Sequence, residues 1–231
     1  MKKKIIFVIP VVIFLAGALI MFYPDIDNWF YDRQVNRMEK QYFEENTKNK
    51  LLDALYKRLQ KYNVKLYENK QDKLVDPFSY SQPSFSLKKY GIKDNCIGFI
   101  SLPAIKMKLP IYLGANTENM SKGAVHLTET SFPIGGDNTN AVIAAHRGTS
   151  KVMFLYINRL KLGDSIIIKN FKETLHYQVC QIKIIAPTEI DKLLIQDGRD
   201  LVTLISCNPP GYHYQRYVVY CERAQPAQPA N

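Results

Sequence analysis

Three residues whose types suit acyl-transfer chemistry stand at the ends of apolar runs in this sequence: His146, Cys207 and Arg216. A cysteine is a nucleophile in its thiolate form, and a nearby cation favours that form. A histidine exchanges a proton near neutral pH, and a guanidinium can stabilise a developing oxyanion. Together they predict nucleophilic catalysis through a covalent intermediate. Taken alone, Cys207 is equally well explained as a small apolar residue of a strand.

A predicted hairpin would place Cys207 next to Arg216. Residues 201–206 form a leucine-rich, β-branched run, and residues 216–222 form a second one. Residues 208–211, Asn-Pro-Pro-Gly, cannot continue a strand, because the prolines remove ladder donors while Asn and Gly favour turns. If the two strands are neighbours, the thiol and the guanidinium share one end of the hairpin.

The order of the motifs along the chain resembles that of a known family. VIAAHRG, with His146 at its end, is followed by TLISC and then by NPPGYHYQR. GFISLPAIKMKLPIYLGA (98–115), GAVHLTETSFPIGGDNTNAVIAAHRG (123–148) and Asp-Pro-Phe (76–78) resemble class C, the pilin-polymerising subgroup. The sequence is therefore similar to the sortases, cysteine transpeptidases of Gram-positive cell surfaces.

The resemblance implies a role for each candidate residue. Cys207 would attack the threonine carbonyl of an LPxTG-like sorting signal and form a thioester, and Arg216 would stabilise the oxyanion. His146 would protonate the departing amine and later act as base when an acceptor amine attacks; in class C that amine is a pilin lysine. Asp76 and Phe78 would form a lid, in which the carboxylate pairs with Arg216 and the ring shields Cys207.

Two other histidines need an assignment. His213 follows Cys207 closely and could act as base in place of His146, but it falls in the predicted turn, and His146 matches the family position. His126, in GAVHLTETS, also matches a class C motif, and we predict a structural role for it. The sequence departs from the class C pattern TLxTCTPYG near the cysteine, with Ser206, Asn208 and Pro210 at the changed places.

The fold predicted for the chain is mostly β. Its 231 residues, 46% of them hydrophobic, can bury one substantial core. Short Val/Ile-rich runs between turn residues predict a sandwich or barrel, and the resemblance selects the eight-stranded sortase β-barrel. The predicted strands are 97–102, 108–113, 140–146, 165–170, 173–185, 201–206 and 216–223, with a helical break near 152–160.

An N-terminal transmembrane helix and extracellular α-helices are predicted before the barrel. Lys2, Lys3 and Lys4 precede residues 5–23, which carry no charge, and about 19 residues at roughly 1.5 Å each span about 28 Å, close to the hydrocarbon thickness. A cleaved signal peptide is the alternative, but the apolar run is longer than a typical signal core. The positive-inside rule places the N-terminus in the cytoplasm and the catalytic domain outside the cell membrane.

The domain boundaries follow from these segments. Leu51, Leu55, Leu59 and Tyr62 recur three or four positions apart and predict one face of a helix in the stalk. We expect a cytoplasmic tail at 1–4, a transmembrane anchor at 5–23, a helical stalk at 24–75, a lid segment and linker at 76–95, the catalytic barrel at 96–223 and a disordered tail at 224–231.

Composition limits the partners. The net charge is +10, but no basic cluster interleaves with aromatic residues, which argues against nucleic acid and for an anionic membrane and cell wall. No spacing resembles a metal site, and we expect no cofactor. Cys96, Cys180 and Cys221 are expected to be reduced, with a Cys180–Cys221 disulfide the only pair left open.

Three other functions are compatible with parts of the sequence. A housekeeping sortase would attach surface proteins to peptidoglycan, but Asp-Pro-Phe and HLTETSFPIGG favour class C. A cell-wall cysteine peptidase would place Cys before His and at a helix N-terminus, the reverse of the order here. A non-enzymatic wall or pilus scaffold would not need His146, Cys207 and Arg216 together.

Overall fold

A computed structural model describes residues 2–47, 49–71, 73–80, 85–148 and 153–224 of the chain, with only some of the side chains before residue 28. The chain divides into two compact units, Met1–Met38 and Glu39–Asn231, and each is described by itself. The tail predicted to be disordered lies outside the described residues from 225 onward.

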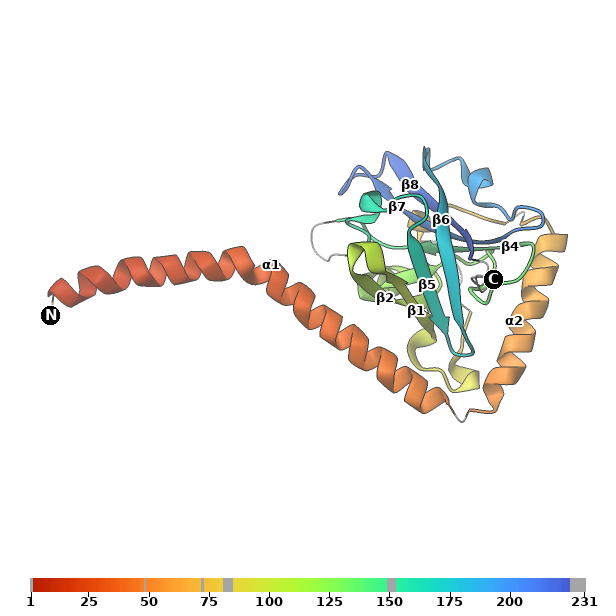
Figure 1. The fold of residues 1–231 in the computed structure, drawn as a ribbon, viewed down its shortest axis with the longest axis horizontal. Helices are drawn as coiled ribbons and strands as arrows, with labels where there is room; N and C mark the ends of the chain where they lie inside the picture. Colours follow the sequence, from red (N-terminus) through yellow and green to blue (C-terminus); the bar gives the residue numbers. More distant parts are fainter. Residues whose placement is uncertain (1, 48, 72, 81–84, 149–152, 225–231) are drawn as a thin grey trace, which may run out of the picture. The chain divides into compact units, whose positions relative to one another are not determined.

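Eight strands close into a barrel (Figure 1), as predicted. Around the barrel the order is β1-β2-β3-β4-β7-β8-β6-β5. The pairs β2–β3 and β4–β7 are parallel, and the other neighbours are antiparallel. The strands are β1 (Cys96–Leu102), β2 (Met107–Leu113), β3 (Ala124–His126), β4 (Thr139–Ala144), β5 (Ser165–Asn170), β6 (Thr174–Ile185), β7 (Asp200–Asn208) and β8 (Gln215–Arg223).

The seven predicted strands are all present, and the eighth, β3, was missed. β3 is only three residues long and follows a short helix, α3 (Thr117–Lys122), so its sequence shows no alternation that could be recognised. The strand predicted to reach His146 ends at Ala144. Within the predicted helical break, the described residues contain a 3₁₀ turn at Ile157–Arg159.

Burial explains the continuous apolar sequences of β4 and β7, the strands that carry the site. β4 is buried at all its positions and β7 at all but its two ends, whereas β5 alternates between buried and less buried residues. A strand that is covered on both faces needs a continuous apolar run rather than an alternating one. The runs at 141–145 and 201–206 are therefore the sequence of central strands.

Helix α2 (Leu51–Glu68) lies along one side of the barrel (Figure 1). Leu55 and Leu59 are fully buried, as predicted, but Leu51 is 52% exposed and its neighbour Leu52 is buried in its place. Residues three and four positions before Leu55 both lie on the same side of a helix. Only the fit against the barrel decides which of the two is covered.

Polar contacts also hold α2 on the barrel. The amide of Asn63 pairs with the backbone of Phe132, accepting from its N at 2.8 Å and donating to its O at 3.2 Å. The hydroxyl of Tyr56 donates to Glu173 at 2.6 Å, and that of Tyr67 donates to Asp197 at 3.1 Å.

Helix α1 (Lys2–Asn46) contains the segment predicted to span a membrane. Within the described part of the chain, no helix combines the length and the hydropathy that crossing a membrane requires. The last turns of α1, from Glu39, belong to the barrel unit. There Tyr42 donates to the carbonyl of Ile97 at 3.2 Å, and Glu39 pairs with Lys108 at 2.7 Å.

Candidate active site

The β7–β8 hairpin places Cys207 directly opposite Arg216. The two residues are register partners in the antiparallel ladder, so their side chains leave the same face of the sheet. Nη1 of Arg216 lies 4.0 Å from Sγ of Cys207. Both residues are buried, with 4% of each exposed. The predicted neighbourhood of thiol and guanidinium is therefore present in the structure.

His146 reaches the same end of the barrel through the parallel pairing of β4 with β7. Ala144 is the register partner of Ile205, and the N–H of Ala145 donates to the Ile205 carbonyl at 3.3 Å. His146 follows Ala145 directly, so it lies near the end of the β7–β8 hairpin that carries Cys207. Burial, together with the nearby His213, lowers the pKa of His146.

The predicted lid segment meets the site through Asp76. Its carboxylate accepts two hydrogen bonds from Arg216, from Nε at 2.8 Å and from Nη2 at 2.9 Å. This bidentate geometry is the strongest form of an arginine–carboxylate pair. The side chain of Arg216 is only 5% exposed and that of Asp76 20%, so the pair is largely removed from water.

Phe78 lies in a 3₁₀ turn, Pro77–Ser79, directly after Asp76. The Arg216 guanidinium stands 4.9 Å from the centroid of its ring, and the ring of His146 stands 6.4 Å from it. The aromatic ring is thus packed against two of the three predicted site residues. Its predicted contact with the third, Cys207, stays a prediction.

The environment of Cys207 contains opposing charges. Burial, the largest effect, raises the pKa of its thiol, and Asp76 raises it as well. The guanidinium groups of Arg216 and Arg147 act in the opposite direction. With the lid segment in place, the sum favours the protonated, less reactive thiol.

Two further side chains lie at this site: His213, which the sequence offered as an alternative base and we set aside, and Arg147, for which we predicted no role. His213, in the turn after β7, places Nδ1 3.4 Å from the Cys207 sulfur. Arg147 donates from Nη1 to the Cys207 carbonyl at 3.5 Å and to the side chain of Asn208 at 2.9 Å. The sequence signal for Arg147 was its place directly after His146 in VIAAHRG. No local pattern indicated that it would contact Asn208.

Comparison with known proteins agrees with this geometry. The sortase domain model matches residues 100–224. The chain belongs to the sortase family. Sortases are cysteine transpeptidases, and the protein is therefore an enzyme of that type.

Relatives of this sortase include named sortases of two kinds. Sortase A of Bacillus anthracis is 26% identical over 94% of both chains. The solved structure titled sortase C1 of GBS pilus island 1 has a TM-score of 0.73 and 30% identity, covering 83% of this chain and 93% of its own. Sortase C from Clostridium perfringens SM101 has a TM-score of 0.69 and 34% identity, covering 82% and 99%.

Arg147 joins the two segments that carry the site of this sortase. Besides its bonds to Cys207 and Asn208, its carbonyl accepts from the N–H of Gly211 at 3.0 Å. Gly211 has φ of +78°, a conformation that favours glycine. The loop after β4 and the turn between β7 and β8 are thus tied at both the backbone and the side chain of one residue.

Arg147→Met is expected to lower the free energy of unfolding by about 1–3 kcal/mol, because it removes a donor from the buried carbonyl of Cys207 and from the part-buried side chain of Asn208. Denaturant melts measure this change. Arg159→Met is the matched control, since Arg159 is exposed and lies over the ring of Tyr156. An equal loss in the two variants would contradict a tie specific to Arg147.

His126, for which we predicted a structural role, is buried and hydrogen-bonded. It is 2% exposed, its Nε2 lies 2.9 Å from the Ser131 carbonyl, and its ring stacks on Phe132. Burial lowers its pKa to about 4, so it is neutral at physiological pH. All four cysteines are free: Cys96, Cys180, Cys207 and Cys221.

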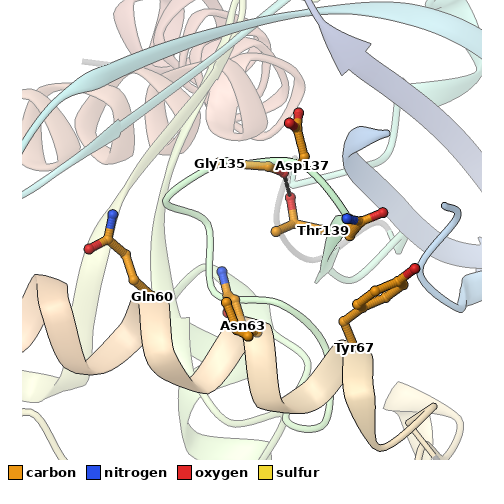
Figure 2. Close-up of a pocket in the computed structure, with 9 residues that line it drawn as sticks. Gln60, Asn63, Tyr67, Gly135, Asp137 and Thr139 are labelled. Carbon is orange, nitrogen blue, oxygen red and sulfur yellow. Dashed lines mark hydrogen bonds between the residues drawn. The ribbon is translucent and has the colours of Figure 1, made fainter. Parts of the chain in front are cut away.

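A pocket of about 310 Å³ lies between α2 and the loop that leads into β4 (Figure 2). Gln60, Asn63 and Tyr67 line it from the helix, and Asp137 and Thr139 from the loop. Thr139 is the first residue of β4, whereas His146 follows the last, so a strand length of about 20 Å separates the pocket from the thiol. The pocket therefore lies away from the predicted catalytic residues of this sortase.

Proposed function

We propose that this sortase is a membrane-anchored class C enzyme that cleaves an LPxTG-like sorting signal and joins the acyl group to a pilin lysine. The observation that carries the class assignment is the bidentate ion pair between Asp76 and Arg216, which holds the segment at 76–80 against the catalytic hairpin. Solved relatives with 30% and 34% identity are sortases C, and one of them is titled as belonging to a pilus island.

In the proposed reaction Cys207 is the nucleophile. Its sulfur attacks the threonine carbonyl, and Arg216, opposite it in the ladder, stabilises the oxyanion. His146 protonates the departing amine, and the acyl group stays on Cys207 as a thioester. An incoming lysine amine then attacks the thioester, with His146 as base, and leaves an isopeptide bond.

In the proposed resting state, Asp76 and Phe78 cover the site as a lid. With Asp76 bound to Nε and Nη2 of Arg216, two donors of the guanidinium are not available to an oxyanion. The carboxylate also raises the pKa of Cys207. The lid therefore lowers the thiolate fraction of Cys207 and occupies the Arg216 guanidinium. The lower thiolate fraction protects an extracellular thiol from oxidation.

The double variant Asp76→Ala, Phe78→Ala is expected to alkylate at Cys207 at least about tenfold faster at neutral pH, since one unit of pKa changes the thiolate fraction tenfold. The rate of carboxymethylation, followed by mass spectrometry, is the measurement. Asp53→Ala with Phe43→Ala is the matched control, because Asp53 pairs with Lys172 on another part of the surface. An unchanged rate in the lid variant would show that the segment does not restrict the thiol.

Membrane anchoring by residues 5–23 is part of the proposal. The segment is uncharged and lies in α1. Ile13, Phe14, Met21 and Phe22 are each at least 51% exposed, and large exposed apolar side chains on a helix are costly in water. Removal of residues 1–23 is expected to shift the protein from the membrane fraction to the soluble fraction of the cell; retention in the membrane would contradict the anchor.

A housekeeping role is the second candidate, because sortase A of Bacillus anthracis aligns over 94% of both chains. In that case the acyl group would pass to a peptidoglycan-precursor amine. The two roles share every step up to the thioester and differ only in the acceptor.

Acceptor competition tests the proposed function. A sorting-signal peptide is incubated with the chain in the presence of equal concentrations of a lysine side-chain amine and a peptidoglycan-precursor amine. We expect the isopeptide to be the main product. A main product with the wall amine would favour the housekeeping role, and hydrolysis alone would indicate a peptidase.

A further inference from the structure

The imidazole in contact with the Cys207 sulfur is that of His213. Its Nδ1 lies 3.4 Å from Sγ, within the range of a hydrogen bond to sulfur. Among the described residues, no hydrogen bond joins Cys207 to His146. The ring of His146 instead stands 6.4 Å from that of Phe78. The imidazoles of His213 and His146 therefore share one site. His213 contacts the sulfur, whereas the family motif contains His146.

The turn that carries His213 is held on both sides of the residue. The His213 carbonyl accepts from Nη1 of Arg216 at 3.2 Å, and the N–H of Gly211 donates to Arg147 at 3.0 Å. The rings of Tyr212 and Tyr214 stack with centroids 5.4 Å apart on either side of it in sequence. The backbone hydrogen bonds of the turn thus position the His213 ring. Because His213 is exposed, the ring can exchange protons with water.

We propose that His213 is a second acid–base residue of this sortase, which takes the proton of the Cys207 thiol as the sulfur attacks the carbonyl, while His146 serves the amine. This inference rests on the proposed transpeptidase chemistry of Cys207. The arrangement separates two tasks that a single histidine cannot perform at once. A lone imidazole can perform them only in succession, by first taking the thiol proton and then giving it to the amine.

The S–H bond breaks and its proton moves to Nδ1 of His213, while the S–C bond forms and the carbonyl oxygen becomes the oxyanion beside Arg216. When the C–N bond breaks, the departing amine takes a proton from His146, which must be in its imidazolium form for this step although burial and His213 lower its pKa. His213 then releases its proton to water, and His146 takes one up, so that no net proton is gained or lost.

Several charged and titratable groups face the sulfur and set the sign of the test. They are His213 in the turn, Arg216 on β8, Arg147 after β4, and Asp76 and Tyr80 in the lid segment. His146 interacts with His213 rather than with the sulfur. An imidazolium beside the sulfur favours the thiolate, as the guanidinium groups do, whereas burial and Asp76 oppose it. Removal of His213 therefore moves thiolate formation to higher pH.

The pH profile of Cys207 alkylation by iodoacetamide tests the proposal. The experiment uses the full chain with Asp76→Ala and Phe78→Ala, so that reagent access is not limiting, and compares His213→Ala, His213→Gln and His146→Ala. His176→Ala is the control, because His176 is an exposed histidine on β6. We expect both His213 variants to alkylate at least about tenfold more slowly at neutral pH, with a midpoint at least about one unit higher, and the control to match the parent.

Gln can accept a hydrogen bond but cannot act as a base, so its failure to rescue identifies proton transfer rather than mere contact. A His213→Ala profile that coincides with the parent, or a slower rate with the same midpoint, would overturn the proposal. So would a midpoint moved by His146→Ala alone. Alkylation needs no sorting signal, so these outcomes are distinct from a failure of transpeptidation itself.

Discussion

Replacing Cys207 by alanine is expected to reduce transpeptidation to background, a loss on the order of 10⁶-fold, the scale seen when a covalent nucleophile is removed. The sulfur is the atom that would carry the acyl group, and no neighbouring side chain can take its place. Initial rates with a sorting-signal peptide and a lysine acceptor measure the change. The fold should persist, since only one buried sulfur is lost from a barrel of eight strands.

Cys180→Ala is the matched control for this prediction. Cys180 is also a free thiol but lies on β6, less buried than Cys207. Its removal is expected to leave the rate within about twofold, as for a surface substitution away from the site. Full activity of Cys207→Ala, with a melting curve like that of the parent, would disprove the assignment of the nucleophile.

Arg216→Lys is expected to have the second largest effect, a fall in kcat/KM of about 10²–10³-fold, the cost of one missing oxyanion donor. Lysine keeps the charge but cannot donate to both carboxylate oxygens of Asp76 and also face the sulfur. The same change loosens the lid, so alkylation of Cys207 should become faster while transpeptidation becomes slower. A faster alkylation together with a slower transpeptidation would show that Arg216 both stabilises the oxyanion and holds the lid.

Arg199→Lys provides the control for Arg216. Arg199 also forms a bidentate pair, with both oxygens of Glu222 at 2.9 Å, but it precedes Asp200 at the other end of β7 from Cys207. We expect neither assay to change by more than about twofold. If Arg216→Lys lowered both rates equally, the lid function of the arginine would be contradicted.

The sequence was most informative where the partners are close along the chain. Cys207 and Arg216 belong to one hairpin, and the Asn-Pro-Pro-Gly turn between them fixed which end they share. His146 could be placed because a strand run ends just before it. The spacing of strands predicted a sandwich or a barrel, and the family resemblance selected the barrel; β3 (Ala124–His126) was too short to leave a pattern.

The contacts that could not be predicted join segments far apart in sequence or depend on orientation. The choice between Leu51 and Leu52 on α2 was made by packing, not by periodicity. Arg147 reaches Asn208 across the site, and neither residue signals the other. His213 was recognised as a possible base, but only coordinates reveal which imidazole the turn directs toward the sulfur.

Trapping of the acyl-enzyme is the most direct test of whether Cys207 carries the acyl group as a thioester. The chain is mixed with a sorting-signal peptide without acceptor, quenched in acid, digested and analysed by mass spectrometry. We expect a hydroxylamine-sensitive adduct of the acyl fragment on the peptide that contains Cys207, which disappears when a lysine amine is added before the quench. An amide product formed with no adduct on Cys207, or an adduct on another residue, would contradict it.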